Sequence, residues 1–472
     1  MLPSVLARQL ERGIEDYIDT TFPMTNEPFK DSLKSVIHGA DCLYHEPLFT
    51  VRLPFRSASS MPSCFQAVQM AYLPYVHQAE AFARLTGDHP RSTLIATGTG
   101  SGKTECFLYP ILEHCYEAYR EGRRGIKALV IYPMNALAQD QADRIMSMIR
   151  SNEKLKGHIS VGMYIGGDVK ARQGPVHTRK DGLMVDREQM RSNPPDILLT
   201  NYKMLDYLLV RPEDSTLWKE NEPETLKFIA VDEFHTFDGA QGTDLACLLR
   251  RLKKRLGTPD HHLCCIGTSA TMGDERARDQ ILSYASEVFG EPFDEGAVIL
   301  EDRLTATEFL EGHARTVFSM PSPKEVQKME ACIQASDKEG YLHEVLSAWL
   351  PDFQEDITSL AGRVALGEAL MQLSFFHSFL TAIRSRFVTA EELAEELRRV
   401  HPNLMEGHEG EIVIESLLAL ISLARNLGNR PFLEVNVQLW LRELRRFEGK
   451  VSAQDVNYAI AHDLNAEQAK HY

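Results

Sequence analysis

The sequence has no long apolar run. None of the uninterrupted apolar stretches in its 472 residues reaches the roughly 18 residues that a membrane-spanning helix needs. The opening residues, MLPSVLARQLERGIEDYIDTTF, mix charged and apolar side chains at helical spacing, whereas a secretory signal has an uninterrupted apolar core. These absences predict a cytoplasmic protein without a membrane partner.

Paired cysteines and an excess of basic residues are also missing. None of the eight cysteines stands in a C-x-x-C pair, which argues against a zinc ribbon and against a redox dithiol. The 67 acidic residues outnumber the 51 Lys and Arg, so the formal net charge is −16. This balance argues against a protein that coats nucleic acid. It is compatible with a local groove of hydroxyls, backbone amides and a few basic side chains.

Short apolar runs are present between residues 71 and 290, separated by amphipathic stretches. Runs this apolar, bounded by Gly, Pro and Asp, are typical of strands buried on both faces. Helical segments between several of them indicate βαβ units, so we predict an α/β domain with a parallel sheet and helices on both faces. The expected strands are residues 92–97, 127–132, 159–164, 196–200, 227–232 and 263–268.

The flanking segments have different patterns. Residues 1–70 combine an amphipathic helix with a loop-rich stretch, and we predict that they form an N-terminal accessory segment. Residues 291–472 show helical periodicity, as in AGRVALGEALMQLSFFHSFLTAIRSRF, and predict a mainly helical C-terminal domain. Within it, the stretch EVNVQLWLRELRRFEGK fits either a strand or a helix.

A glycine-rich loop, in LIATGTGSGKTECFLYPIL, joins an expected strand to an expected helix, the context that a phosphate-binding loop requires. Its glycines allow the backbone N–H groups to face a β-phosphate, and the start of the helix adds its positive dipole end. Lys103 could reach the β- and γ-phosphates, and Thr104 could ligate Mg²⁺. The predicted ATP-binding loop is Thr97, Gly98, Thr99, Gly100, Ser101, Gly102, Lys103 and Thr104, with Thr97 at a position where glycine is usual.

Two acidic residues follow the expected strand KFIAV. Asp232 and Glu233 would lie at the carboxyl end of this strand, where ligands bind in open α/β sheets. Asp232 could hold Mg²⁺ together with Thr104, and Glu233 could deprotonate the attacking water. The alternative is a solvated turn with two carboxylates. The loop upstream and the SAT sequence downstream favour a catalytic set of Lys103, Asp232 and Glu233.

In this order, TGTGSGKT, DEFH and SAT resemble motifs I, II and III of the superfamily-2 DExH (DEAD/DEAH-box) helicases. LPYVHQAEAF is similar to their adenine-sensing Q-motif, YPMNALAQDQ to motif Ia and TNYKMLDYLL to motif Ib. YPMNAL, LLTNY, the block DEFHTFDGAQGT and the opening LPSVLARQL resemble the large bacterial helicases of DNA repair and phage defence. The resemblance covers residues 1–290 and implies a RecA-like fold.

The resemblance also implies roles for single residues. Gln78 would recognise the adenine edge, and His235, Ser269 and Thr271 would couple the nucleotide state to movement of the strand. Short hydroxyl and amide side chains on loops can bind DNA phosphates without demanding a base sequence. The implied contacts with the nucleic-acid backbone are Pro133, Asn135, Gly166, Gly167, Thr200 and Asn201.

The signatures of a second motor domain are missing. The pattern Q-x-x-G-R-x-G-R does not occur, and the Gly-Arg of AGRVALGEAL lies in a helical pattern without the preceding glutamine. Superfamily-2 motors hydrolyse ATP between two RecA-like domains, the second of which supplies an arginine finger. We therefore expect a split or truncated motor half that hydrolyses ATP weakly by itself and requires a partner protein with that domain.

Two functions remain open from the sequence. The leading hypothesis is an ATP-dependent DNA helicase or translocase subunit in phage defence or DNA repair. The alternative is a scaffold subunit that binds DNA under the control of a nucleotide and unwinds nothing. An unrelated P-loop ATPase is disfavoured by the loops that resemble motifs Ia and Ib.

Overall fold

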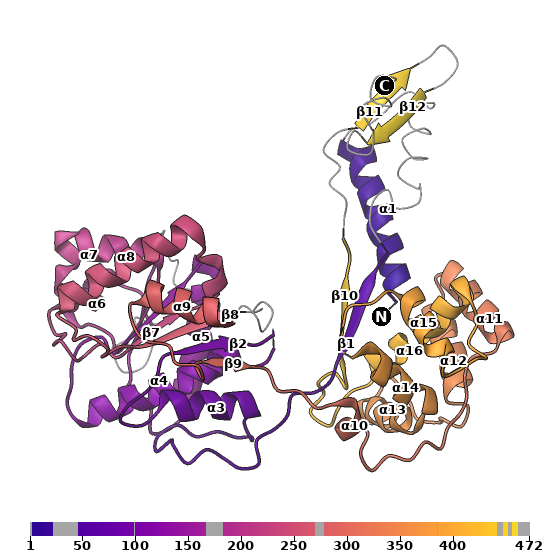
Figure 1. The fold of residues 1–472 in the computed structure, drawn as a ribbon, viewed down its shortest axis with the longest axis horizontal. Coiled ribbons are helices and arrows are strands. Elements are labelled where there is room, and N and C mark those ends of the chain that lie inside the picture. The colour runs from indigo at the N-terminus through magenta and orange to yellow at the C-terminus, as the bar shows by residue number, and fades with distance from the viewer. Residues whose placement is uncertain are drawn as a thin grey trace. The chain divides into compact units, whose positions relative to one another are not determined.

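The computed structural model describes residues 2–21, 46–98, 100–166, 183–269, 278–384, 386–440, 447–451 and 456–460. The chain divides into two compact units: unit 1 combines Met1–Pro54 with Leu304–Tyr472, and unit 2 is Phe55–Arg303 (Figure 1). These borders differ from the changes in sequence pattern near residues 70 and 290. The reason is that Ala67 and Val68 are buried in the core of unit 2, and a strand after residue 290 joins its sheet.

Unit 2 is built on an eight-stranded sheet with the order β5-β4-β6-β3-β7-β8-β2-β9, in which every pairing is parallel. All six expected strands form, and the α/β fold is confirmed. The two edge strands, β5 and β9, have no counterpart among the predicted runs because they are only two and three residues long. The strands are β2 (Thr93–Ala96), β3 (Ala128–Tyr132), β4 (Val161–Tyr164), β5 (Leu183–Met184), β6 (Ile197–Asn201), β7 (Phe228–Val231), β8 (Cys264–Ser269) and β9 (Val298–Leu300).

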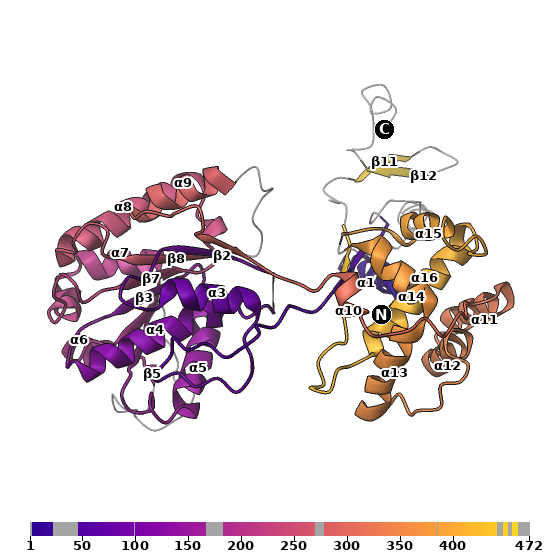
Figure 2. The same ribbon diagram turned by 60° about the horizontal axis from the view of Figure 1, so that its bottom comes forward.

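Successive residues of the strands point into two cores on opposite faces of the sheet. In β3, Leu129 and Ile131 belong to one core, and Ala128 and Val130 belong to the other. Helices α6 to α9 cover the first face and α3 to α5 the second (Figure 2), which confirms the expected layers. These helices are α3 (Val76–Leu85), α4 (Lys103–Arg120), α5 (Asn135–Ser151), α6 (Arg187–Ser192), α7 (Tyr202–Val210), α8 (Gly239–Leu256) and α9 (Arg278–Phe289), with 3₁₀ turns at Pro212–Trp218 and Phe234–Thr236.

Unit 1 is mainly helical and combines two distant parts of the chain. Strand β1 pairs antiparallel with β10, so the stretch EVNVQ is a strand, and β11 pairs with β12. Throughout the described part of the chain, no helix is long and apolar enough to cross a membrane. The elements are α1 (Pro3–Thr21), β1 (Leu48–Arg52), α10 (Ala306–Phe309), α11 (Pro323–Gln334), α12 (Lys338–Trp349), α13 (Leu360–Gln372), α14 (Ser374–Ile383), α15 (Ala390–Arg398), α16 (Gly407–Leu423), β10 (Glu434–Gln438), β11 (Phe447–Val451) and β12 (Val456–Ile460).

Because all strands of unit 2 are parallel, their carboxyl ends meet at one edge of the sheet, where open α/β sheets bind ligands. The segments that leave this edge carry nearly all the predicted site residues. They follow β2 (the glycine-rich loop), β3 (Pro133 and Asn135), β4 (Gly166) and β7 (Asp232 and Glu233), and Asn201 and Ser269 are the last residues of β6 and β8.

Candidate active site

The glycine-rich loop curls tightly between β2 and α4. Gly100 and Gly102 have φ values of +79° and +77°, a conformation that residues with a Cβ rarely adopt. A Cβ on Gly102 would also overlap the Nε2 of Gln78. Thr97 is buried, and its hydroxyl lies 2.6 Å from the Oγ of Ser101, so its side chain closes the loop from inside. Thr99 lies outside the described residues.

Two side chains of α3 hold this loop from one side. The Nε2 of His77 donates to the Ser101 carbonyl at 2.9 Å, and the Nε2 of Gln78 donates to the Gly102 carbonyl at 3.3 Å. Burial lowers the pKa of His77, so the imidazole is neutral at pH 7. His77 was not among the predicted site residues, although its position next to Gln78 offered a signal. The Oε1 of Gln78 accepts from the Tyr75 N–H, and its adenine contact stays a prediction.

The acidic pair is organised by Thr268 on β8. The Thr268 hydroxyl donates to the Asp232 carboxylate and accepts from the Glu233 N–H at 3.2 Å. Glu233 has φ +50° and ψ +47°, a left-handed conformation that costs a non-glycine residue about 1–3 kcal/mol. This backbone brings the Oε1 of Glu233 to 3.9 Å from the Nζ of Lys103. The two predicted halves of the site therefore meet.

His235 contacts both neighbouring motifs. Its Nδ1 lies 3.4 Å from the Oε2 of Glu233 and 3.2 Å from the Oγ of Ser269. This arrangement suits the predicted coupling between the acidic pair and the SAT segment. Thr271 lies outside the described residues.

The expected nucleic-acid loops are joined by amide side chains. The Nδ2 of Asn201 donates to the Oδ1 of Asn135 at 2.6 Å, and the Nδ2 of Asn135 donates to the Gly166 carbonyl at 3.2 Å. The Oδ1 of Asn201 also accepts from the Met204 N–H and caps α7. Three loops that are distant in the sequence thus form one surface at the carboxyl edge.

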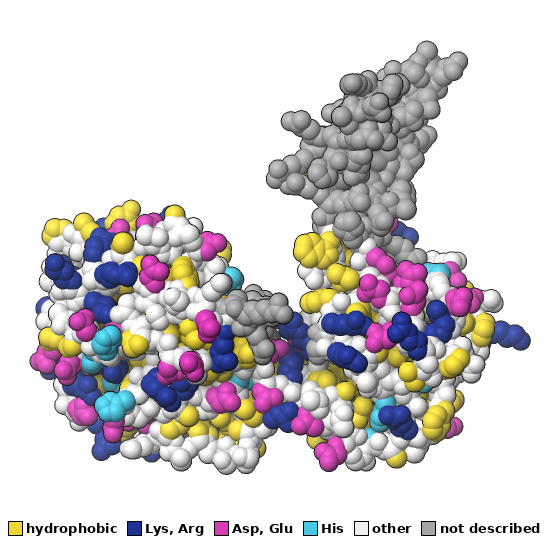
Figure 3. Space-filling view, viewed as in Figure 1, with side chains coloured by type: hydrophobic (Ala, Val, Ile, Leu, Met, Phe, Trp, Pro, Cys, Tyr) yellow, Lys and Arg dark blue, Asp and Glu magenta, His cyan; other side chains and the backbone are white. Residues whose placement is uncertain are grey.

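The remaining predicted contacts on this surface differ in accessibility. Thr200 is fully buried, and its hydroxyl donates to the Tyr164 carbonyl at 2.7 Å, so its side chain supports the loop from below. Pro133 is partly exposed after β3, and Gly167 lies outside the described residues. On the face of unit 2 that Figure 3 shows, basic and acidic side chains are interspersed. Contact with nucleic acid through these loops stays a prediction.

The site has the donors that Mg·ATP requires. The Nζ of Lys103 is buried and has no hydrogen-bond partner among the described residues, so a phosphate oxygen would satisfy it. The positive φ values of Gly100 and Gly102 curl the backbone in the way that an anion-binding loop needs. Thr104, in the first turn of α4, and Asp232 offer the oxygen ligands that Mg²⁺ prefers.

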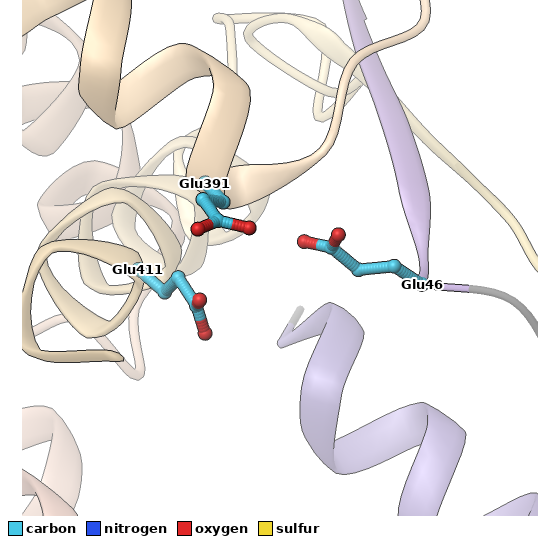
Figure 4. A group of neighbouring side chains, drawn as sticks. All are labelled: Glu46, Glu391 and Glu411. Atoms are coloured by element: carbon cyan, nitrogen blue, oxygen red, sulfur yellow. The ribbon is translucent and has the colours of Figure 1, made fainter. Parts of the chain in front are cut away.

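A second group of carboxylates lies in unit 1 and is unrelated to this site. Carboxylate oxygens of Glu46, Glu391 and Glu411 all lie within 4.8 Å of one another (Figure 4). Partial burial, followed by the charges of Glu411 and Glu391, raises the pKa of Glu46. The group consists of surface acids that repel one another, and we assign no ligand to it.

The comparison with protein families agrees with the site. Residues 75–279 match the DEAD/DEAH box helicase family. The chain carries a DEAD/DEAH-box helicase domain. The resemblance to superfamily-2 helicases that the motifs predicted is therefore confirmed, and the domain spans both the Q-motif helix α3 and the SAT segment.

Individual relatives match this helicase domain over a limited length. Druantia protein DruE of Escherichia coli (strain UMEA 4076-1) is 27% identical over 42% of this chain and 16% of its own length. The ATP-dependent helicase YprA of Bacillus subtilis (strain 168) is 32% identical over 43% of this chain and 23% of its own length. A DNA-bound structure of the DUF1998 helicase MrfA is similar with 21% identity and a TM-score of 0.40, covering 66% of this chain and 44% of that chain. The chain thus spans only a small part of these curated relatives.

Proposed function

We propose that the helicase domain binds Mg·ATP at the carboxyl edge of its sheet and uses ATP hydrolysis to move along DNA as a helicase or translocase subunit. The observation that carries this proposal is the meeting of the P-loop lysine with the acidic pair, with 3.9 Å between the Nζ of Lys103 and the Oε1 of Glu233. The network of Asn135, Asn201 and the Gly166 carbonyl supports a nucleic-acid surface on the same edge.

Each residue of the site has a defined task in this proposal. The loop amides and Lys103 would bind the β- and γ-phosphates, and Thr104 and Asp232 would hold Mg²⁺, which would neutralise charge on the phosphates. Glu233 orients the attacking water and accepts its proton. Thr268 fixes the Asp232 carboxylate, and His235 passes changes at Glu233 to Ser269.

A second RecA-like domain, supplied by a partner protein, would complete the motor. Stabilisation of the transferring phosphoryl group requires an arginine finger opposite the P-loop. The described part of unit 1 consists of helices and two antiparallel strand pairs, which is a different architecture from a RecA-like parallel sheet. We place the complex in phage defence or DNA repair, because its motifs resemble those of large helicases in these pathways.

The test is ATP binding and hydrolysis by the purified chain, with and without single-stranded DNA and the partner. Lys103→Ala should abolish nucleotide binding. Glu233→Gln should retain ATP and lower the hydrolysis rate by about 10²–10⁴-fold, the usual contribution of a general base. Stimulation by DNA supports a motor. Binding of ATP and DNA without turnover, even with the partner, supports the scaffold alternative. Normal hydrolysis by Glu233→Gln would show that Glu233 is not the base.

A further inference from the structure

A carboxylate outside the helicase motifs contacts the phosphate-binding loop. Glu301 is the first residue after β9, and its Oε2 accepts a hydrogen bond from the Gly98 N–H at 2.8 Å. The contact follows from the sheet, because β9 pairs with β2 with Leu300 opposite Ala96. Both segments therefore leave the carboxyl edge side by side. Because β9 lies on one side of β2 and β8 and β7 lie on the other, Glu301 comes to the loop from the side of β2 away from the strand β7 that precedes the acidic pair.

Arg303 holds this carboxylate in place. The Nε of Arg303 donates to the Oε1 of Glu301 at 2.9 Å, and the arginine side chain is 12% exposed. The guanidinium carbon of Arg303 lies 3.8 Å from the centre of the Phe55 ring, so the arginine is fixed by an ion pair and a cation–π contact together. The hydrogen bond from the Gly98 N–H and the ion pair with Arg303 together fix the position of the partly buried Glu301 carboxylate.

The loop is thus held at both of its ends. His77 and Gln78 bind the carbonyls of Ser101 and Gly102 at the end next to α4, and Glu301 binds the N–H of Gly98 at the end next to β2. A glycine-rich backbone has many accessible conformations, and a tether that selects the curled one lowers the entropy that nucleotide binding must remove. Arg303 neutralises the carboxylate, which limits its repulsion of a triphosphate.

We propose that Glu301 is a positioning residue that preforms the ATP site, and that Arg303 acts through Glu301. The proposal rests on the proposed function of this site as an ATP-binding loop. It also proposes a way to control this site, because Glu301 and Arg303 lie next to a border at which the chain passes between the two units. These borders are Pro54–Phe55 and Arg303–Leu304.

These two chain segments are fastened to each other inside unit 2. The Arg56 N–H donates to the Asp302 carbonyl at 2.9 Å, and the Nε of Arg56 lies 3.0 Å from the Oδ1 of Asp302. A shift of residues 55–56 and 302–303 would therefore reach Gly98 through Arg303 and Glu301. By thermodynamic reciprocity, nucleotide binding must stabilise these segments if they stabilise the loop.

The experiment compares nucleotide affinity and turnover in Glu301→Ala, Arg303→Ala and the double variant. With a fluorescent ATP analogue, Glu301→Ala should bind about tenfold more weakly, the effect of one hydrogen bond to a charged group. The rate at saturating ATP should stay within about twofold, because no group that touches the reacting atoms has changed. The double variant should be no weaker than Glu301→Ala alone. Glu295→Ala, an exposed carboxylate in the same unit, should bind as the wild type does.

Hydrogen exchange supplies the readout that a merely structural role would not change. In the wild type, the ATP analogue should slow exchange at residues 53–57 and 300–304, and Glu301→Ala should lose this protection. Glu301→Gln keeps an oxygen for the Gly98 N–H and should recover part of the affinity, which keeps the test valid if the alanine variant is unstable. Wild-type affinity in folded Glu301→Ala would overturn the inference. Absence of binding in the wild type itself would instead refute the proposed function.

Discussion

Thr268 shows how one hydroxyl can arrange two carboxylates. It donates to Asp232 and accepts from the Glu233 N–H, so the loss of its oxygen removes both of these hydrogen bonds. Ser269 and Thr271 next to it were predicted from their motif, but Thr268 was not. The signal for Thr268 was tertiary, because only the pairing of β7 with β8 places its hydroxyl beside the acids.

We predict that Thr268→Val, which keeps the shape and removes the hydroxyl, lowers the hydrolysis rate about tenfold, the value of one hydrogen bond to a charged group. Thr268→Ser retains the hydroxyl and should stay within about threefold of the wild type, a loss below that of one hydrogen bond. Affinity for an ATP analogue, measured in parallel, should change little in both variants. Equal rates for Thr268→Val and the wild type would contradict this role.

His114, on α4, gives unit 2 a defined response to acid. The ring of His114 packs edge-on against Phe228. Burial, followed by the positive charge of Arg123 and of other basic side chains near His114, lowers the pKa of His114 from 6.5 to about 3. A lowered pKa means that the folded state binds the proton less readily than the unfolded state does. The contribution of His114 to the free energy of unfolding is therefore fully present above pH 6.5 and is lost as the pH falls from 6.5 towards 3.

We therefore predict that unit 2 loses about 1–2 kcal/mol of unfolding free energy from this residue between pH 7 and pH 5. His114→Phe should flatten that part of the pH profile in urea unfolding. The exposed His89 provides the control, since His89→Asn should retain the wild-type slope. An unchanged slope in His114→Phe would assign the acid response to other groups.

At the scale of elements, the contact between α8 and α9 depends on a glycine of the block GAQGT. The Tyr284 hydroxyl of α9 donates to the Phe237 carbonyl, and a Cβ on Gly242 would overlap that hydroxyl. The contact fixes the turn after the acidic pair, and a cavity of about 220 Å³ next to it is lined by Tyr284, His235 and Ser269. The close packing of Tyr284 therefore explains why position 242 is a glycine.

Gly242→Ala should destabilise unit 2 by about 1–3 kcal/mol, the usual effect of overpacking. Tyr284→Phe removes the overlapping oxygen, so the double variant should recover part of that loss, and thermal unfolding of the four proteins measures the coupling. Additive losses would mean that the two residues do not act on each other.

At the scale of the whole molecule, the hydrophobic core of unit 1 includes the short strand β1, which is distant in the sequence from the helices it packs against. Phe49 and Val51 of β1 are buried in the helical core of unit 1, and β1 pairs with β10 with Phe49 opposite Val437. The expected accessory segment is thus divided: residues 48–52 belong to the core of unit 1, and Ala67 and Val68 belong to unit 2.

We predict that Phe49→Ala lowers the stability of unit 1 by about 3–5 kcal/mol, as for other buried aromatic residues. Unit 2 has its own cores and should unfold as in the wild type, so calorimetry should show a shift in one transition only. Phe318→Ala, at an exposed phenylalanine of unit 1, should change neither transition. A shift in both transitions would show that the two units unfold together.

The sequence alone was enough to predict the candidate nucleotide site and the central sheet of this protein. GSGKT and DEFH are rarely found outside nucleotide-binding sites when they occur in this order and context. Six apolar runs between helical segments allow few folds, because strands buried on both faces need helices on each side of the sheet. Lys103, Asp232 and Glu233 could be named from these patterns, and the tertiary structure brings them together.

The tertiary structure alone decided the contacts made by residues without a motif. Strand β9 is three residues long, too short for a periodic pattern, and only its pairing with β2 places Glu301 on the loop. Likewise, the EVNVQ stretch forms a strand because it pairs with β1. Local patterns fix which segments form buried elements, whereas the order in which these elements pair is set by packing between residues far apart in the chain.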